Sequence, residues 1–183
     1  IGYNKSMMIF NMLRQEIGDE LFVKSIQDFY AKNKFKKAGF NDLKKCFEKI
    51  TGRELDSFFQ QWLMRSGAPL LEISRAECAA DPAGFKLNFT LKQTQLDDVF
   101  ELDVPVAVHL QDSKKAVMQR LRMDSKVQDY QLTFKERPLL IDVDPQFDLF
   151  RFLHRAEVPP ALSQAFGSEK VAIILPATDK SDL

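Results

Sequence analysis

The pattern of apolar residues changes within one stretch of the chain, Phe58-Phe59-Gln60-Gln61-Trp62-Leu63-Met64-Arg65-Ser66-Gly67-Ala68-Pro69-Leu70-Leu71-Glu72-Ile73. Its first half predicts a helix, because apolar residues recur at helical spacing from Leu55 to Leu63. Gly67 favours the positive φ found past a helix end, and Pro69 prevents a restart. From Leu70 onward the apolar period is near 2 for roughly seventy residues. We therefore expect a helical lobe to meet a β lobe here, with Trp62 packed near the junction as a core residue.

The composition is that of a globular protein without a charge bias. Hydrophobic residues make up 45% and charged residues 28% of the 183. Lys plus Arg equals Asp plus Glu at 26 each, which favours neither nucleic acid nor an anionic membrane as a partner. No apolar run approaches the ~20 residues of a membrane span. The chain begins Ile1-Gly2-Tyr3, so we expect it to start within a longer protein.

The first seventy residues predict four helices joined by short loops. Residues 4–17 are apolar over much of the circumference, and we expect this helix to be buried nearly all round. Further helices are expected at 19–32, with Asp19 as N-cap, and at 41–50, ended by Gly52. The loop from Lys34 to Gly39 is basic, which is typical of a solvated turn. Cys46 and Cys78 fall in different lobes, so we expect two free thiols.

The middle of the chain predicts a small antiparallel β-sandwich. A turn at 81–84 is followed by apolar residues in alternation over 85–91, 100–110, 117–123, 130–134 and 139–143. One face of each strand should be wet, and His109 lies on that face as a surface residue. Pro105 places its strand at an edge or a bulge.

The tail changes character again. The sequence predicts a short helix over 145–154, another beginning at Pro159-Pro160, and a buried strand over 171–175. The expected architecture is α+β: a four-helix lobe over residues 1–71, an antiparallel β-sandwich over 72–145, and a helical tail over 146–183 that begins a further domain.

Motifs for catalysis are few. The two histidines do not form His-Glu-x-x-His, and no phosphate loop, Cys-x-x-Cys or Gly-x-Ser-x-Gly is present. His154 and Glu157 have a ligand-like spacing but no further ligands nearby. Asp142 and Asp144 flank Val143, where turn capping is favoured over weak cation binding. The residues alone predict a catalytically incomplete chain.

Two motifs, in the right order and spacing, resemble those of the M1 zinc aminopeptidases, the aminopeptidase N-like gluzincins. Tyr3-Asn4-Lys5-Ser6 stands where the family has Tyr-Glu-Lys-Gly, and the apolar helix that follows contains Met12-Leu13. The family segment Phe-Phe-x-x-Trp-x-x-x-x-Gly-x-Pro is matched from Phe58 to Pro69. The similarity covers residues 3–73.

The resemblance implies that residues 1–71 end a thermolysin-like catalytic domain whose zinc ligands precede Ile1. It implies a zinc-dependent hydrolase that removes N-terminal residues from peptides, with zinc in the full-length protein and none in this fragment. Tyr3 would be the catalytic residue that donates a hydrogen bond to the oxyanion, a task for which a phenol is a neutral donor. Asn4 and Ser6 depart from the family motif.

Other functions stay open at this point. M1-like proteins that lack a zinc site serve as scaffolds or interaction modules, and the departures at Asn4 and Ser6 permit that alternative. A free-standing adaptor would make the resemblance a coincidence. If the first helix normally packs against a preceding lobe, Met7, Met8, Phe10 and Met12 would lose cover, and a dimer through this helix is expected.

Overall fold

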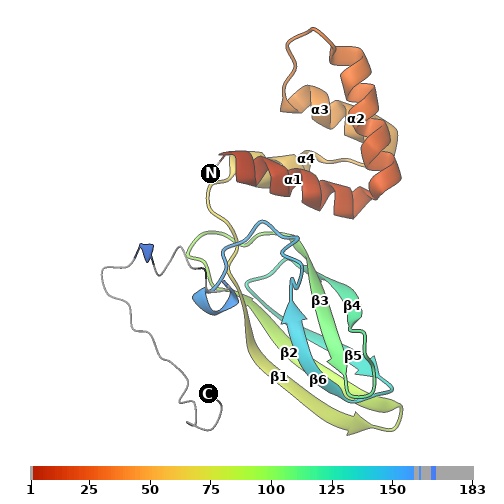
Figure 1. The fold of residues 1–183 in the computed structure, drawn as a ribbon, viewed down its shortest axis with the longest axis vertical. Helices are drawn as coiled ribbons and strands as arrows, with labels where there is room; N and C mark the ends of the chain where they lie inside the picture. Colours follow the sequence, from red (N-terminus) through yellow and green to blue (C-terminus); the bar gives the residue numbers. More distant parts are fainter. Residues whose placement is uncertain (1, 159–160, 162–165, 168–183) are drawn as a thin grey trace, which may run out of the picture. The chain divides into compact units, whose positions relative to one another are not determined.

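A computed structural model describes residues 2–158, 161, 166 and 167. The chain forms two compact units, residues 1–152 and 153–183. In the described part of the first unit, four helices precede six strands (Figure 1): α1 Gly2–Ile17, α2 Asp19–Asn33, α3 Phe40–Thr51, α4 Asp56–Phe59, β1 Leu71–Asp81, β2 Gly84–Gln93, β3 Leu102–Leu110, β4 Val117–Met123, β5 Val127–Phe134 and β6 Pro138–Val143. The predicted α+β class, helices first and antiparallel strands second, is confirmed.

The first three helices lie close to the predicted bounds. Two other predictions about them, the burial of α1 and the N-cap of α2, are wrong. Ile9, Leu13 and Ile17 form the buried face of α1 as expected, but Tyr3 and Met7 are exposed. The prediction that this helix is buried nearly all round is therefore wrong, because neighbouring elements cover only one side of it. The N-cap of α2 is Gly18 at φ 84° rather than Asp19, which is the first helical residue. Gly52 ends α3 in the left-handed conformation, as predicted.

The helix that opens the junction has about the predicted length, but its second half is wider than an α-helix. After α4 the chain continues as a π-helix, η1 Gln60–Met64. The wider turn changes the direction of successive side chains. As a result, Phe59 lies in the core of the helical lobe, whereas Trp62 lies in the core of the sandwich. Gly67 has the expected positive φ of 76°.

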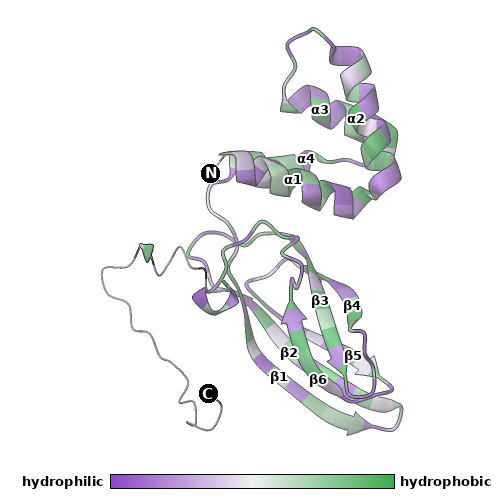
Figure 2. Ribbon diagram, viewed as in Figure 1, coloured by the Kyte–Doolittle hydropathy of each residue, from purple (hydrophilic) through white to green (hydrophobic). Residues whose placement is uncertain are grey.

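The six strands form two three-stranded antiparallel sheets, with orders β1-β2-β5 and β4-β3-β6. Most of the predicted inward residues of β2 (Leu87, Phe89, Leu91) and of β3 (Val104, Val106, Val108) are buried, whereas Phe85 and Leu110 near the strand ends are partly buried. Figure 2 shows β3 as a largely hydrophobic strand. The turn between β1 and β2 is closed by the Asp81 carboxylate, which accepts a hydrogen bond from the backbone of Ala83 at 3.1 Å.

Two expectations for β3 are wrong. Pro105 marks neither an edge nor a bulge, since β3 is the central strand of its sheet and pairs with β4 without a register shift at Pro105. Its carbonyl accepts from the backbone of Asp144 where β6 ends, so the missing N–H of Pro105 interrupts no continuing ladder. Nor is the outer face of β3 fully wet, because Ala107 is buried between the longer side chains of Met118 and Asp142. His109 is a surface residue, as predicted, and pairs with Asp142 at 3.0 Å.

One core joins the helices to the sandwich at the predicted junction. It contains Ile9 and Met12 of α1 together with Trp62 and the inward residues of the sheets. The indole of Trp62 stacks on Phe100 at a ring distance of 5.4 Å and meets Phe150 edge-on at 6.1 Å. A second core lies within the helices around Leu13, Phe47 and Leu55. Cys46 and Cys78 are free, as predicted, although only Cys46 is buried.

The predicted helix over 145–154 is absent, and the helical turn described beyond β6 is a 3₁₀ turn, η2 Arg155–Glu157. Asp144 and Phe147 have φ values of 52° and 55°, which helical backbone excludes. The predicted helix from Pro159-Pro160 and the strand over 171–175 lie outside the residues whose structure is described.

Candidate functional site

Tyr3 lies on the first turn of α1, where its side chain is 95% exposed. Its phenol is therefore accessible from outside this unit. Asn4 beside it is also exposed, and Ser6 is partly buried.

Lys5 fixes the turn that carries Tyr3. Its ammonium group donates to the carbonyl of Arg65 at 2.9 Å and lies 5.5 Å from the centre of the Phe150 ring. The first contact ties α1 to the end of η1, and the second ties it to the segment that follows β6. Lys5 is part of the Tyr-x-Lys motif, but no pattern in the sequence indicates these partners.

A pocket of about 540 Å³ lies where α1 and η1 meet the sandwich. Its lining includes four carboxylates (Glu16, Glu101, Asp103, Asp148) and three guanidinium groups (Arg65, Arg120, Arg122). Tyr3 is not part of the lining. Arg122 pairs with Glu101 and lies 3.8 Å from Asp103. Since the two signs of charge nearly balance, the pocket favours neither an anionic nor a cationic ligand.

Hydrogen bonds at this pocket join the helical lobe to the sandwich. The Gln61 amide donates to the carbonyl of Glu101 and accepts from its N–H, both at 2.8 Å. The Arg65 guanidinium lies 3.8 Å from the Phe100 ring centre and donates to two backbone carbonyls. Burial, followed by the charge of Asp103, raises the pKa of Glu16. These contacts identify the pocket as part of a structural seam.

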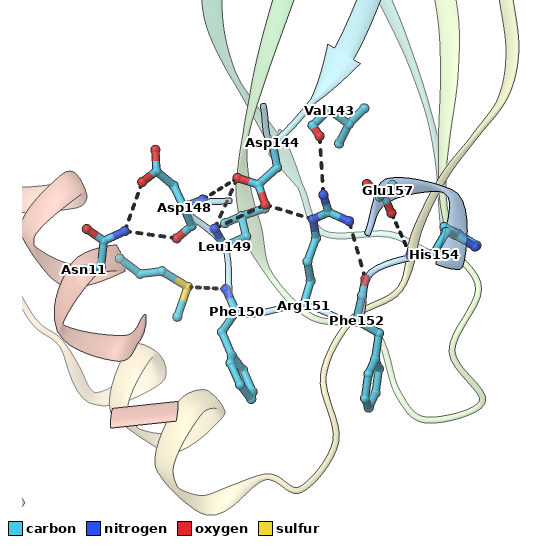
Figure 3. Close-up of polar contacts among 11 residues, drawn as sticks. Asn11, Val143, Asp144, Asp148, Leu149, Phe150, Arg151, Phe152, His154 and Glu157 are labelled. Atoms are coloured by element: carbon cyan, nitrogen blue, oxygen red, sulfur yellow. Dashed lines mark hydrogen bonds and ion pairs between the residues drawn. The ribbon is translucent and has the colours of Figure 1, made fainter. Parts of the chain in front are cut away.

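The segment 144–152, which we call the strap, completes the seam (Figure 3). Its first residue, Asp144, accepts from the backbone N–H groups of Asp148 and Leu149 and pairs with Arg151 at 2.9 Å. Both charged side chains are almost fully buried. Burial raises the pKa of Asp144, while the hydrogen bond from Arg151 opposes that shift. The predicted turn-capping role of Asp144 is confirmed.

The strap also contacts α1. Asn11 donates to the carboxylate of Asp148 at 3.0 Å, and the N–H of Phe150 points to the sulfur of Met12 at 3.5 Å. Met12 is 8% exposed. The expectation that it loses its cover is therefore wrong, because the strap and the sandwich supply that cover.

The described residues do not fit a zinc site. Among them, no group of three or more His, Cys, Asp or Glu side chains is placed to hold a metal. Asp142 and Asp144 do not act together, since one pairs with His109 and the other with Arg151. The Glu157 carboxylate accepts from the backbone of His154 at 2.8 Å in a capping arrangement. No helix in the described part is long and apolar enough to cross a membrane.

The arrangement, an α-helical lobe joined through a seam to a small β-sandwich, is found in a solved aminopeptidase. This chain matches the crystal structure of Legionella pneumophila aminopeptidase A in complex with aspartic acid, with a TM-score of 0.63 and 21% identity. The match covers 80% of this chain and 17% of the aminopeptidase chain. That likeness concerns the fold.

Sequence comparison finds similarity to one family at the start of the chain. Residues 1–62 match the family model described as Peptidase family M1 domain. Aminopeptidase N of Lactococcus lactis subsp. lactis is 30% identical over 71 residues, covering 39% of this chain and 8% of the relative. Aminopeptidase N of Streptomyces lividans is 27% identical over 93 residues, covering 51% and 10%. These comparisons show that residues 1–62 are similar to the M1 peptidase family, in agreement with the resemblance seen in the motifs.

Proposed function

We propose that the full-length protein is an M1 zinc aminopeptidase that hydrolyses N-terminal residues from peptides. The observation that carries the proposal is the family match over residues 1–62, among relatives named aminopeptidases. The chain spans about a tenth or less of the length of these relatives, so the activity belongs to a larger protein. Within it, we assign residues 1–71 to the catalytic domain, 72–145 to the sandwich and 146–183 to a tail.

The zinc ligands would lie outside these 183 residues, and the isolated chain would be inactive. This part of the proposal rests on the family resemblance, in which the zinc ligands precede the segment matched by residues 3–73. The test adds zinc and an aminoacyl reporter substrate to the isolated chain. We expect no zinc-dependent turnover, and turnover would contradict the proposal.

Tyr3 would donate its phenolic proton in a hydrogen bond to the oxyanion that forms at the scissile carbonyl. Its exposure on α1 supports this role, since a donor aimed at a part of the catalytic domain outside this chain must be free of the core described here. Lys5 would act as a positioning residue through its hydrogen bond to the Arg65 carbonyl and its approach to the Phe150 ring of the strap.

In the full-length enzyme, we expect Tyr3→Phe to lower kcat by about 10²–10³, with a small change in KM, because the donor acts mainly in the transition state. Steady-state kinetics with a reporter peptide measure this. The matched control is Tyr130→Phe, which removes a hydroxyl from the sandwich. Equal activity of Tyr3→Phe and wild type would exclude the role. A full-length protein with neither zinc nor turnover would favour the scaffold alternative.

The isolated chain is also proposed to dimerise through α1. Met7 is 64% exposed and Tyr3 beside it 95%, while Met8 and Phe10 are partly covered. Such apolar surface favours association. Sedimentation equilibrium should show a dimer that Met7→Lys converts to a monomer with unchanged circular dichroism. A wild-type monomer at high concentration would contradict this.

A further inference from the structure

The connection between α2 and α3 carries a cluster of exposed aromatic and basic side chains. We call it the basic tip and define it as Lys34, Phe35, Lys36, Lys37 and Phe40. Residues 34–40 are all exposed. Figure 1 shows this connection at the end of the helical lobe away from the sheets. None of these residues belongs to either hydrophobic core.

Phe35 is the most unusual residue of the basic tip. Its side chain is 96% exposed, and its φ is 62°. Positive φ is costly for a residue with a Cβ and is normally taken by Gly or Asn. The ring lies 5.0 Å from the ammonium group of Lys34, which does not shield it from solvent. Folding thus presents an aromatic ring in a strained conformation without burying it, which points to a role outside the fold.

The charge of the basic tip is not neutralised locally. The flanking carboxylates are engaged elsewhere: Asp28 pairs with Lys32 and Lys49, and Asp42 accepts from the backbone of Gly39 at 2.9 Å. Within the described residues, no carboxylate pairs with the three lysines of the tip. Lys36 instead donates to the carbonyl of Lys32 at 3.0 Å, which leaves its charge intact. A chain without net charge therefore concentrates positive charge at one point.

We propose that the basic tip docks on an anionic lipid surface. Lysines are attracted to such a surface within a Debye length, and Phe rings insert at the boundary between headgroups and acyl chains. Exposed Phe rings beside the lysines favour a lipid surface over a soluble acidic polypeptide, since the rings add apolar contact with the membrane interface to the attraction between charges. With three lysines and few rings, binding is weak and reversible. This role is independent of the proposed peptidase activity.

The experiment measures co-sedimentation of the 183-residue chain with lipid vesicles. One set is phosphatidylcholine alone, and the other contains about 30% phosphatidylserine. We expect at least about tenfold stronger partitioning to the anionic vesicles, falling steeply with added salt. Equal binding to both sets would overturn the proposal.

Variants then locate the contact. We expect K34Q/K36Q/K37Q to weaken partitioning roughly a hundredfold, about fivefold for each lysine. The matched control, K114Q/K115Q/K126Q, removes the same charge from exposed sites on the sandwich and should change partitioning by less than about twofold. If the control variant binds the vesicles as weakly as the tip variant, only the net charge of the chain matters, and the assignment to the basic tip is overturned.

The aromatic contribution is tested separately. Phe35→Asn suits the positive φ and should keep or raise the melting temperature while weakening vesicle binding several-fold. In Phe35→Trp, the added indole should shift its emission to the blue on anionic vesicles, against the unchanged signal of buried Trp62. Soluble polyglutamate is the competing probe. Polyglutamate binding that depends on the same lysines, together with vesicle binding that is unchanged by substitution of Phe35, would show that the partner is an acidic polypeptide and that the lipid proposal is wrong.

Discussion

At the scale of single residues, the strap depends on one buried ion pair. The side chains of Asp144 and Arg151 are 0% and 1% exposed. Two charges are stable in such a site only when each satisfies the other together with further hydrogen bonds. The backbone donors of Asp148 and Leu149 provide these bonds for the carboxylate. Removal of either side chain should therefore destabilise the whole strap.

We expect Arg151→Met to lower the free energy of unfolding by about 3–5 kcal/mol, because it leaves the Asp144 carboxylate buried without a cation. Urea denaturation of the 183-residue chain measures the change. Asp142→Asn is the control, since its exposed pair with His109 is worth less than about 1 kcal/mol. The double variant Asp144→Asn/Arg151→Met should recover part of the loss. An Arg151→Met effect no larger than the control would show that the pair does not hold the strap.

The sequence predicts one half of this pair. A carboxylate just before Pro145 is typical of a turn cap, so the role of Asp144 could be predicted. Its partner could not, because no periodic pattern relates Arg151 to it. Positive φ at Asp144 and Phe147 brings the two together, and neither is a glycine that would indicate such a conformation.

At the scale of elements, a tyrosine connects the two sheets. Tyr130 on β5 donates from its hydroxyl to the carbonyl of Arg122 on β4 at 2.7 Å. Its ring stacks on Phe89 of β2 at 5.4 Å. Burial, followed by the charge of Asp124, raises the pKa of Tyr130 to about 12. The phenol is thus held in its neutral form by the fold.

The raised pKa sets the direction of the pH dependence. An unfolded phenol titrates near about pH 10, so the stability contributed by Tyr130 is complete below that pH and is lost as pH rises toward 12. Since the side chain is only partly buried, screening limits the loss to about 1 kcal/mol. Urea denaturation above pH 10 should show a smaller pH-dependent loss for Tyr130→Phe than for wild type. The exposed Tyr30→Phe serves as control, and a wild-type-like slope for Tyr130→Phe would contradict the assignment.

Alternation of apolar residues predicts strands because burial alternates with the pleat, and the inward sides of β2 and β3 follow it. It does not predict which strands become neighbours. Pro105 shows the limit: its ring excludes one hydrogen bond, but the position at which β6 ends decides that the strand is central. The π-helix η1 was missed for a similar reason, since α and π turns share the same apolar residues.

At the scale of the whole unit, residues 1–152 should unfold in a single transition. The core around Trp62 includes residues of α1 and of both sheets, and Gln61 joins the lobes by two hydrogen bonds. Far-UV circular dichroism reports mainly the helices, and Trp62 fluorescence reports the seam. We expect the two urea transitions to coincide.

Gln61→Ala provides the internal control for this prediction. It removes both bonds to Glu101 and should lower the two midpoints together, by an amount that corresponds to about 1–2 kcal/mol. Loss of helix at a lower urea concentration than the change in Trp62 would show that the lobes unfold independently.

The strap has a consequence for chimeric enzymes. It returns to α1 from more than a hundred residues later in the chain, and α1 is the helix that carries Tyr3. A sandwich transplanted from a relative would therefore place a strap of different sequence against that helix. In such a chimera, the strap should keep its contacts with α1 only when Asn11 and Met12 are exchanged along with residues 144–152.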